Sequence, residues 1–171
     1  RKIVISTGAV TTFAGSPGSR SSTNGTGTSA RFYYPGAITT DGTNLYVADT
    51  SNHLIRKIVI STGAVTTLAG STSSGSTDAT GTSARFKHPR GITTDGTNLY
   101  VADTDNHAIR KIVIATGAVT TLAGSTSGST NATGTSARFN NPPGITTDGT
   151  NLYVADTSNH KIRKIVISTG A

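Results

Sequence analysis

The nonapeptide Arg-Lys-Ile-Val-Ile-Ser-Thr-Gly-Ala occupies residues 1–9 and returns unchanged at residues 163–171. An identical copy begins at Arg56 and one with a single difference begins at Arg110, so that successive copies lie 55, 54 and 53 residues apart. A period of this size is typical of propellers and solenoids. We therefore interpret residues 1–171 as a single repeat domain, with units that start at 1, 56 and 110 and a fourth copy that begins at 163.

Each unit carries four strand patterns separated by polar turns. In the middle unit we expect strands at 91–95, 99–103, 109–114 and 118–123. β-Branched and aromatic residues fill these runs, while Gly, Asn and Asp fill the turns between them. No stretch shows the apolar period of a helix. The expected fold class is all-β, with four antiparallel strands per unit.

The strands are apolar on both faces, as in Leu-Tyr-Val-Ala at 99–102 and Ile-Val-Ile at 112–114. A sheet of this kind must be covered on both sides. Four-stranded sheets packed between identical neighbours form a β-propeller, in which each sheet is one blade. A β-helix is the rival architecture, but its coils are shorter and do not need three hairpin turns in each unit.

A long segment rich in Ser, Thr and Gly follows the fourth strand of each unit. These segments, 15–31, 70–85 and 124–138, contain all the length differences between units. We expect them to be surface loops that join one blade to the next, because surface loops tolerate such differences. Phe32, Phe86 and Phe139 are expected to anchor these loops between blades.

Several spaced phrases resemble the NHL repeat. The family pattern is Pro-x-Gly-Ile, then Leu-Tyr-Val-Ala-Asp, then Asn-x-x-Ile-Arg. In the middle unit it is matched by Pro89, Gly91, residues 99–103, Asn106 and residues 109–110. The other units carry the counterparts of these residues, except that Ala37 replaces the Gly in the first unit. The resemblance covers the whole chain and implies a six-bladed ring. It also implies several functions on one fold, since NHL propellers serve as RNA-binding surfaces, docking platforms, sensor ectodomains and, in relatives, metal-dependent lyases.

The near-identity of the units indicates either recent amplification or deliberate construction. The Ser/Thr-rich loops resemble those of repetitive bacterial NHL-type proteins, which implies an extracellular or cell-surface bacterial origin. No signal peptide and no apolar run long enough to span a bilayer is visible in this chain. We therefore expect no membrane insertion.

Three blades leave an apolar sheet face bare at each end, and such a face is an association site. We expect a homodimer that closes a six-bladed ring, because the chain starts with the third strand of a blade and ends after the third strand of another. That third strand is present twice, at 1–6 and at 163–168. Two explanations stay open: one copy is displaced in the dimer, or the chain is part of a longer array.

Composition excludes some chemistry and leaves other chemistry open. The absence of Cys rules out disulfides and thiolate metal sites. The net charge of +7 is compatible with nucleic-acid binding, but the basic residues recur once per unit instead of clustering. We therefore expect Arg56, Arg110, Arg163 and their Lys neighbours to be solvated structural residues, and any nucleic-acid binding to be weak.

The repeated His and Asp residues are candidate metal ligands. His53, His107 and His160 lie in equivalent polar turns that blade geometry should hold too far apart for one ion. Asp49, Asp103 and Asp156 are expected to brace the backbone of the turn that follows them, because calcium needs a denser oxygen cluster. We predict no catalytic residue, no metal site and no cofactor.

The positions that differ between units gather in two places: the loop before the first strand, and the turn between the second and third strands. In a propeller these two places share one face. Variation there is typical of a recognition surface on a fixed scaffold, and it is also what neutral drift at exposed loop positions produces. The candidate binding face consists of Tyr33, Tyr34, Lys87, His88, Arg90, Asn140, Asn141, Asp105 and Lys161. Its ligand would be a protein or another surface ligand.

Overall fold

The computed structural model describes residues 1–171 and consists of antiparallel sheets. The middle blade contains β8 (Pro89–Thr94), β9 (Asn98–Asp103), β10 (Ala108–Val113) and β11 (Val119–Gly124), in that order. The first blade contains β4 (Pro35–Thr40), β5 (Asn44–Asp49), β6 (Leu54–Val59) and β7 (Ala64–Gly70), with the short β3 (Gly25–Thr26) added outside β7. The expectation of an all-β fold with four-stranded blades is confirmed.

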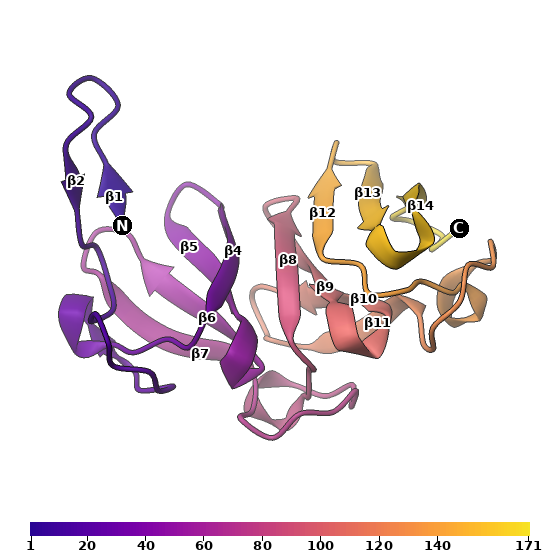
Figure 1. Ribbon diagram of the computed structural model, residues 1–171, viewed down its shortest axis with the longest axis horizontal. Helices are drawn as coiled ribbons and strands as arrows, with labels where there is room; N and C mark the ends of the chain where they lie inside the picture. The colour runs from indigo at the N-terminus through magenta and orange to yellow at the C-terminus, as the bar shows by residue number, and fades with distance from the viewer.

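The two ends of the chain hold incomplete blades. The last blade has only β12 (Gly144–Thr147), β13 (Asn151–Asp156) and β14 (Lys161–Val166). At the other end, β1 (Lys2–Ile3) and β2 (Val10–Thr11) form a separate hairpin. This hairpin projects away from the first blade in Figure 1, while the C-terminus lies at the opposite end of the molecule.

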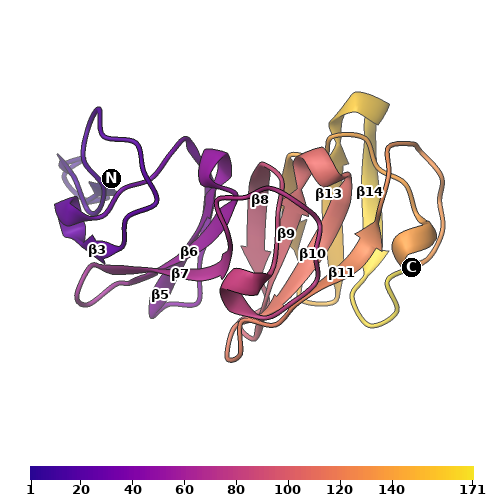
Figure 2. The ribbon, with the colours of Figure 1, turned by 90° about the horizontal axis from the view of Figure 1, so that it is seen from below.

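The three blades stand side by side in an open arc (Figure 1), and Figure 2 shows the same row of blades from below. The first strands β4, β8 and β12 are neighbours along the arc. The core consists of layers between blades. Tyr46 and Ile55 of the first blade pack against Phe86 and Leu99 of the second, and the same layer recurs at the second junction. Stability therefore depends on contacts between blades.

The loop phenylalanines fill these layers as the sequence predicted. Phe86 and Phe139 are fully buried at the two junctions. Phe32 is only half-buried, because no blade precedes the first one in this chain. The loop phenylalanine is therefore fully buried only where a blade lies on both sides of it.

The turn between the first and second strands is built by one aspartate in each blade. The Asp95 carboxylate accepts the backbone N–H groups of Thr97 at 2.8 Å and Asn98 at 2.6 Å, and the Tyr100 hydroxyl at 2.8 Å. Burial opposes the effect, but the hydrogen bonds from Asn98 and Tyr100 hold the pKa of Asp95 below its ordinary value. These bonds fix the hairpin between β8 and β9.

Candidate functional site

The structure brings the variable loop and the variable turn of each blade together. The N–H of Asp105 donates to the carbonyl of Lys87 at 3.2 Å, and Ser51 with Tyr33 and Ser158 with Asn140 repeat this bond. In the middle blade the His88 Nδ1 and an Asp105 carboxylate oxygen also lie 2.7 Å apart. The candidate binding face is therefore a continuous strip of loops.

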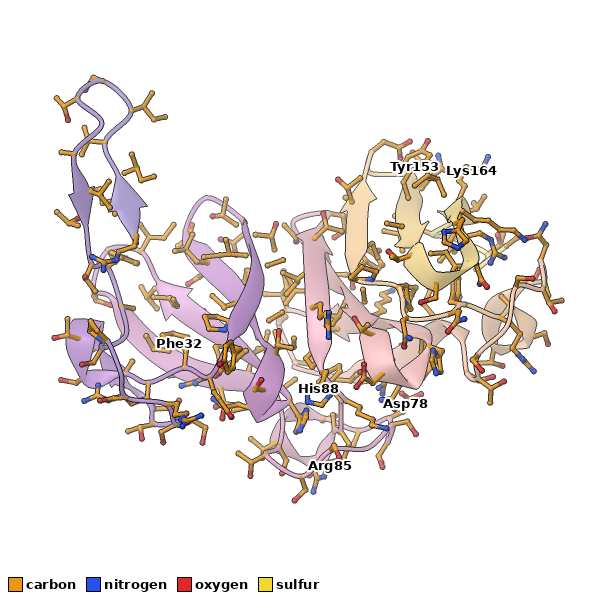
Figure 3. All side chains as sticks on the ribbon, viewed as in Figure 1. Phe32, Asp78, Arg85, His88, Tyr153 and Lys164 are labelled. Atoms are coloured by element: carbon orange, nitrogen blue, oxygen red, sulfur yellow. The ribbon has the colours of Figure 1, made fainter.

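The predicted residues of this face differ in exposure. Tyr34, Lys87, Arg90, Asn141 and Lys161 are exposed, whereas Tyr33, His88, Asp105 and Asn140 are half-buried. Figure 3 shows His88 below the lower end of β8 in that view, where the loop reaches the first strand. No residue of the set is in the core, so each remains available to a ligand.

The first unit presents an aromatic pair that the others lack. The rings of Tyr33 and Tyr34 lie 5.2 Å apart, and the Arg20 guanidinium stacks over Tyr33 at 5.5 Å. The three side chains line a shallow basin of about 420 Å³. Sequence reasoning missed Arg20, which sits in the variable part of the loop and has no basic counterpart in the other units.

The repeated histidines lie at the junctions between blades. His53, His107 and His160 all adopt positive φ, between 53° and 60°, at the end of a single 3-10 turn. His53 Nδ1 accepts the N–H of His88 at 3.1 Å, and His107 Nδ1 accepts that of Asn141 at 3.2 Å. Burial, together with the neighbouring His88, lowers the pKa of His53. His53 and His107 thus join consecutive blades, whereas no blade follows His160 in this chain. No three His, Asp or Glu side chains converge as a metal site would require.

The expectation of solvated arginines is wrong. The side chains of Arg56 and Arg110 have no exposed surface, and that of Arg163 is only 10% exposed. Each guanidinium pairs with the aspartate seven residues earlier, at 2.9 Å for Arg56 and Asp49. It also lies over the loop phenylalanine, 5.2 Å from the ring of Phe32 in the first unit. A buried charge requires such partners, which composition alone does not reveal.

The guanidinium ties the long loop to the blade. Arg56 donates to the carbonyls of Arg31 at 3.0 Å and Thr23 at 3.2 Å, and to the side-chain oxygen of Asn24 at 2.8 Å. Arg110 and Arg163 repeat this set of bonds, with Asp78 and Asn131 in the place of Asn24. We call the Arg, its Asp and these loop acceptors the arginine clamp. Its sequence signal is a fixed spacing, because the polar acceptor always lies 32 residues before the Arg.

The aspartates have a different role from the one expected. Asp49 accepts the N–H of Tyr33 in the preceding loop at 2.8 Å, the Asn52 side-chain amide at 2.8 Å and Arg56, so it braces the loop before the blade. The sequence prediction placed its donors in the backbone of the following turn. The buried carboxylates are engaged within the protein and contribute no ligand to the surface.

Each end of the arc exposes side chains that are buried at the junctions. Ile162 of β14 is 77% exposed, whereas its counterparts Ile55 and Ile109 are fully buried. At the other end Ile38 is 57% exposed, against 5% for Ile92. Tyr153 and Lys164 lie together on the C-terminal blade in Figure 3, far from the N-terminal hairpin. Each end therefore exposes a blade face that is covered at the inner junctions.

Known proteins share this repeat in sequence and in structure. The chain is 33% identical to the human NHL repeat-containing protein 2 over 186 residues, which cover 99% of this chain and 26% of that protein. The chain belongs to the NHL-repeat family. The family is assigned from these relatives, since no family model matches the chain. The chain spans about a quarter of the length of this curated relative.

Solved structures with the same architecture include NHL-like propellers. An auxiliary nutrient binding protein from Bacteroides thetaiotaomicron is 27% identical with a TM-score of 0.65, over 74% of this chain and 36% of that one. A streptogramin B lyase, at 17% identity, has a TM-score of 0.53 over 79% of this chain and 38% of that one. The lyase shows the fold alone. In general terms the NHL propeller fold supports a binding or scaffold module, and the structure contains no helix able to cross a membrane.

Proposed function

We propose that this NHL-repeat chain is a non-enzymatic scaffold or binding module that associates with a second copy of itself to complete its ring. The observation that carries the proposal is the pair of bare junction halves. Ile162 and Ile38 belong to opposite halves, and each is exposed only because its partner blade is missing from this chain. Burying such side chains stabilises by about 1.5–3 kcal/mol each.

The polar contacts of the inner junctions support the same proposal. The Thr50 hydroxyl donates to the Pro89 carbonyl at 2.8 Å, and Thr104 donates to Pro142 at 2.9 Å. Thr157 and His160 are the counterparts at the end of the arc, where no blade follows. In a closed ring they would bond to Pro35 and Tyr34 of the second copy.

A non-enzymatic role is supported by where the recurrent polar residues are used. The arginine clamps and the junction histidines hold loops and blades in place, and the remaining differences between units lie on the candidate binding face. We propose that a protein or another surface ligand binds there. The similarity to a bacterial nutrient-binding propeller supports an extracellular or cell-surface location for this role.

Nucleic-acid binding is a second candidate, favoured by the stacked Arg20 and Tyr33 beside Tyr34. The arginine clamps weaken it, because three of the basic residues counted in the net charge are engaged by aspartates. A lyase role has only the shared fold in its favour.

The test is the mass of the chain in solution. We expect light scattering to give twice the chain mass of 17.4 kDa. Ile162→Asp should produce a folded monomer, because it places a charge in the new junction and leaves the existing ones untouched. Ile5→Asp is the matched control, since Ile5 is fully exposed in the hairpin and outside the junction. A wild-type monomer, an odd number of chains or an open-ended polymer would each contradict the closed dimer.

A further inference from the structure

A groove of about 460 Å³ lies on the last blade where the other blades have their fourth strand. It is lined by Asn131, Ala132, Ala171 and residues 161–164. One wall is therefore β14, and the other is the loop that precedes the blade. In the first and middle blades the strands β7 and β11 lie between these same two walls.

The walls of the groove carry the groups that bind a strand in the middle blade. There the N–H of Val119 donates to the Ala79 carbonyl at 2.9 Å. The N–H and hydroxyl of Thr121 both reach the Asp78 carboxylate at 3.0 Å. Ala132 and Asn131 are the counterparts of Ala79 and Asp78 in the last blade. The groove thus offers the bonds that a fourth strand would make.

The segment around β2 has the sequence of a fourth strand. Residues 9–15 read Ala-Val-Thr-Thr-Phe-Ala-Gly, and residues 64–70 and 118–124 differ from them only by Leu in place of Phe. Phe13 and Ala14 pack against the core cluster of the first blade, as Leu68 and Leu122 pack against the blades that follow them. The N–H of Gly15 donates to Gly27 at 3.1 Å. This segment already has the position of a fourth strand relative to the blade after it.

Residues 9–15 lack most of the contacts that a fourth strand makes with the rest of its own blade. A Cβ built on Gly124 would lie 2.4 Å from the His107 carbonyl oxygen and 2.7 Å from the Phe139 ring. A Cβ on Gly15 would meet only the Phe32 ring, at 3.2 Å. The absent neighbour corresponds to His160 and the start of β14, which lie at the other end of the arc.

β1 and β14 are two copies of the third strand, and either could pair with β2. β1 makes fewer contacts with the rest of the protein than β14 does. In the hairpin β1 pairs with β2 at Lys2 with Thr11 and Ile3 with Val10, and both strands are exposed. β14 pairs with β13 over six residues, and its Arg163 belongs to an arginine clamp. Arg1, the counterpart of Arg163, reaches only the Thr12 hydroxyl, at 3.0 Å. β1 is therefore the copy that is easily displaced.

We infer that β2 of one copy fills the groove of the other, pairing with its β14 and displacing its own β1. This inference rests on the proposed ring closure and specifies how the junction is made. The middle-blade register, in which Lys111 faces Thr120 and Ile112 faces Val119, places Lys164 opposite Thr11 and Ile165 opposite Val10 of the second copy. Strand exchange of this kind adds main-chain hydrogen bonds to the apolar contact between copies.

Paired cysteines test the register, because the chain has none of its own. Thr11→Cys with Lys164→Cys should form disulfides between copies, giving a covalent species of twice 17.4 kDa on a non-reducing gel. Facing residues of an antiparallel pair lie within the Cα separation that a disulfide spans. All these positions are exposed in the single chain, so folding should be retained, with far-UV circular dichroism as the check.

The matched control is Lys2→Cys with Thr11→Cys, which locks β1 to β2 within one chain. Its oxidised form should be a monomer and its reduced form a dimer. A wild-type monomer would overturn the ring closure and the exchange together. A wild-type dimer that gives no Thr11–Lys164 cross-link, and that persists when β1 is locked, would overturn the exchange alone.

Discussion

Removing the carboxylate of an arginine clamp should destabilise the protein by several kcal/mol. In Asp49→Ala the fully buried Arg56 guanidinium loses its only carboxylate, and the Tyr33 N–H and the Asn52 amide lose an acceptor. Breaking a buried ion pair by deleting one partner costs about 3–5 kcal/mol. This is a large share of the about 5–15 kcal/mol by which most domains are stable.

The assay is urea unfolding followed by circular dichroism, combined with trypsin cleavage at Arg31. Cleavage should accelerate, because Arg56 holds the Arg31 carbonyl and the Thr23 carbonyl in place. Asp103→Ala should cost less, since Arg110 retains Asp78 at 2.6 Å. That remaining pair is partly exposed and adds about 1 kcal/mol or less.

A double variant distinguishes lost charge pairing from lost packing. Asp49→Leu with Arg56→Met removes both charges and keeps apolar volume, so it should be less destabilising than Asp49→Ala. A loss below about 1 kcal/mol for the single variant would refute the reasoning. So would a double variant that is equally unstable, because the cost would then not come from an unpaired buried charge.

Four further outcomes are expected. The melting temperature should fall below about pH 4, where the turn aspartates lose the stabilisation that their lowered pKa provides, and Asp148→Asn should reduce that acid sensitivity. It should also fall above about pH 10, because burial and the bond to Asp41 raise the folded-state pKa of Tyr46 to about 12; unchanged melting at pH 11 would contradict this. Gly124→Ala should destabilise by at least about 1 kcal/mol in urea unfolding, since φ is +83° and the new methyl group would lie 2.4 Å from the His107 carbonyl; wild-type stability would show that the turn can shift. Binding to RNA or single-stranded DNA should be weak and lost by about 0.2 M salt in a filter-binding assay, whereas salt-resistant, sequence-specific binding would favour the nucleic-acid hypothesis.

The repeat period and the two-sided apolar strands were enough to predict the propeller, because each blade makes similar local demands. The strands fall within two residues of their expected bounds, as with β9, expected at 99–103 and found at 98–103. Phe86 and Phe139 could be placed between blades for the same reason. The three copies also fix where each unit begins and ends.

The arginine clamp could not be predicted with equal success, because its partners are distant in sequence. A basic residue in a strand is usually solvated, and the loop carbonyls that bind Arg56 lie 25 and 33 positions earlier, in the long segment before the blade. The constant distance to Asp49, seven residues before it, was visible but has no meaning until the strands are paired. On the candidate binding face the loops were placed from topology, while the Arg20 contact with Tyr33 needed coordinates.

The arginine clamp also determines where the chain can change in length. All three clamps hold their loops at the same offsets, 25 and 33 residues before the Arg. The loops nevertheless differ in length, so every insertion or deletion falls upstream of the clamp, within 16–22, 71–76 and 125–129. We expect these short segments to accept insertions, because surface loops tolerate changes in length. A foreign peptide placed in one of them would be displayed beside the blade, with the strand registers on either side of it preserved.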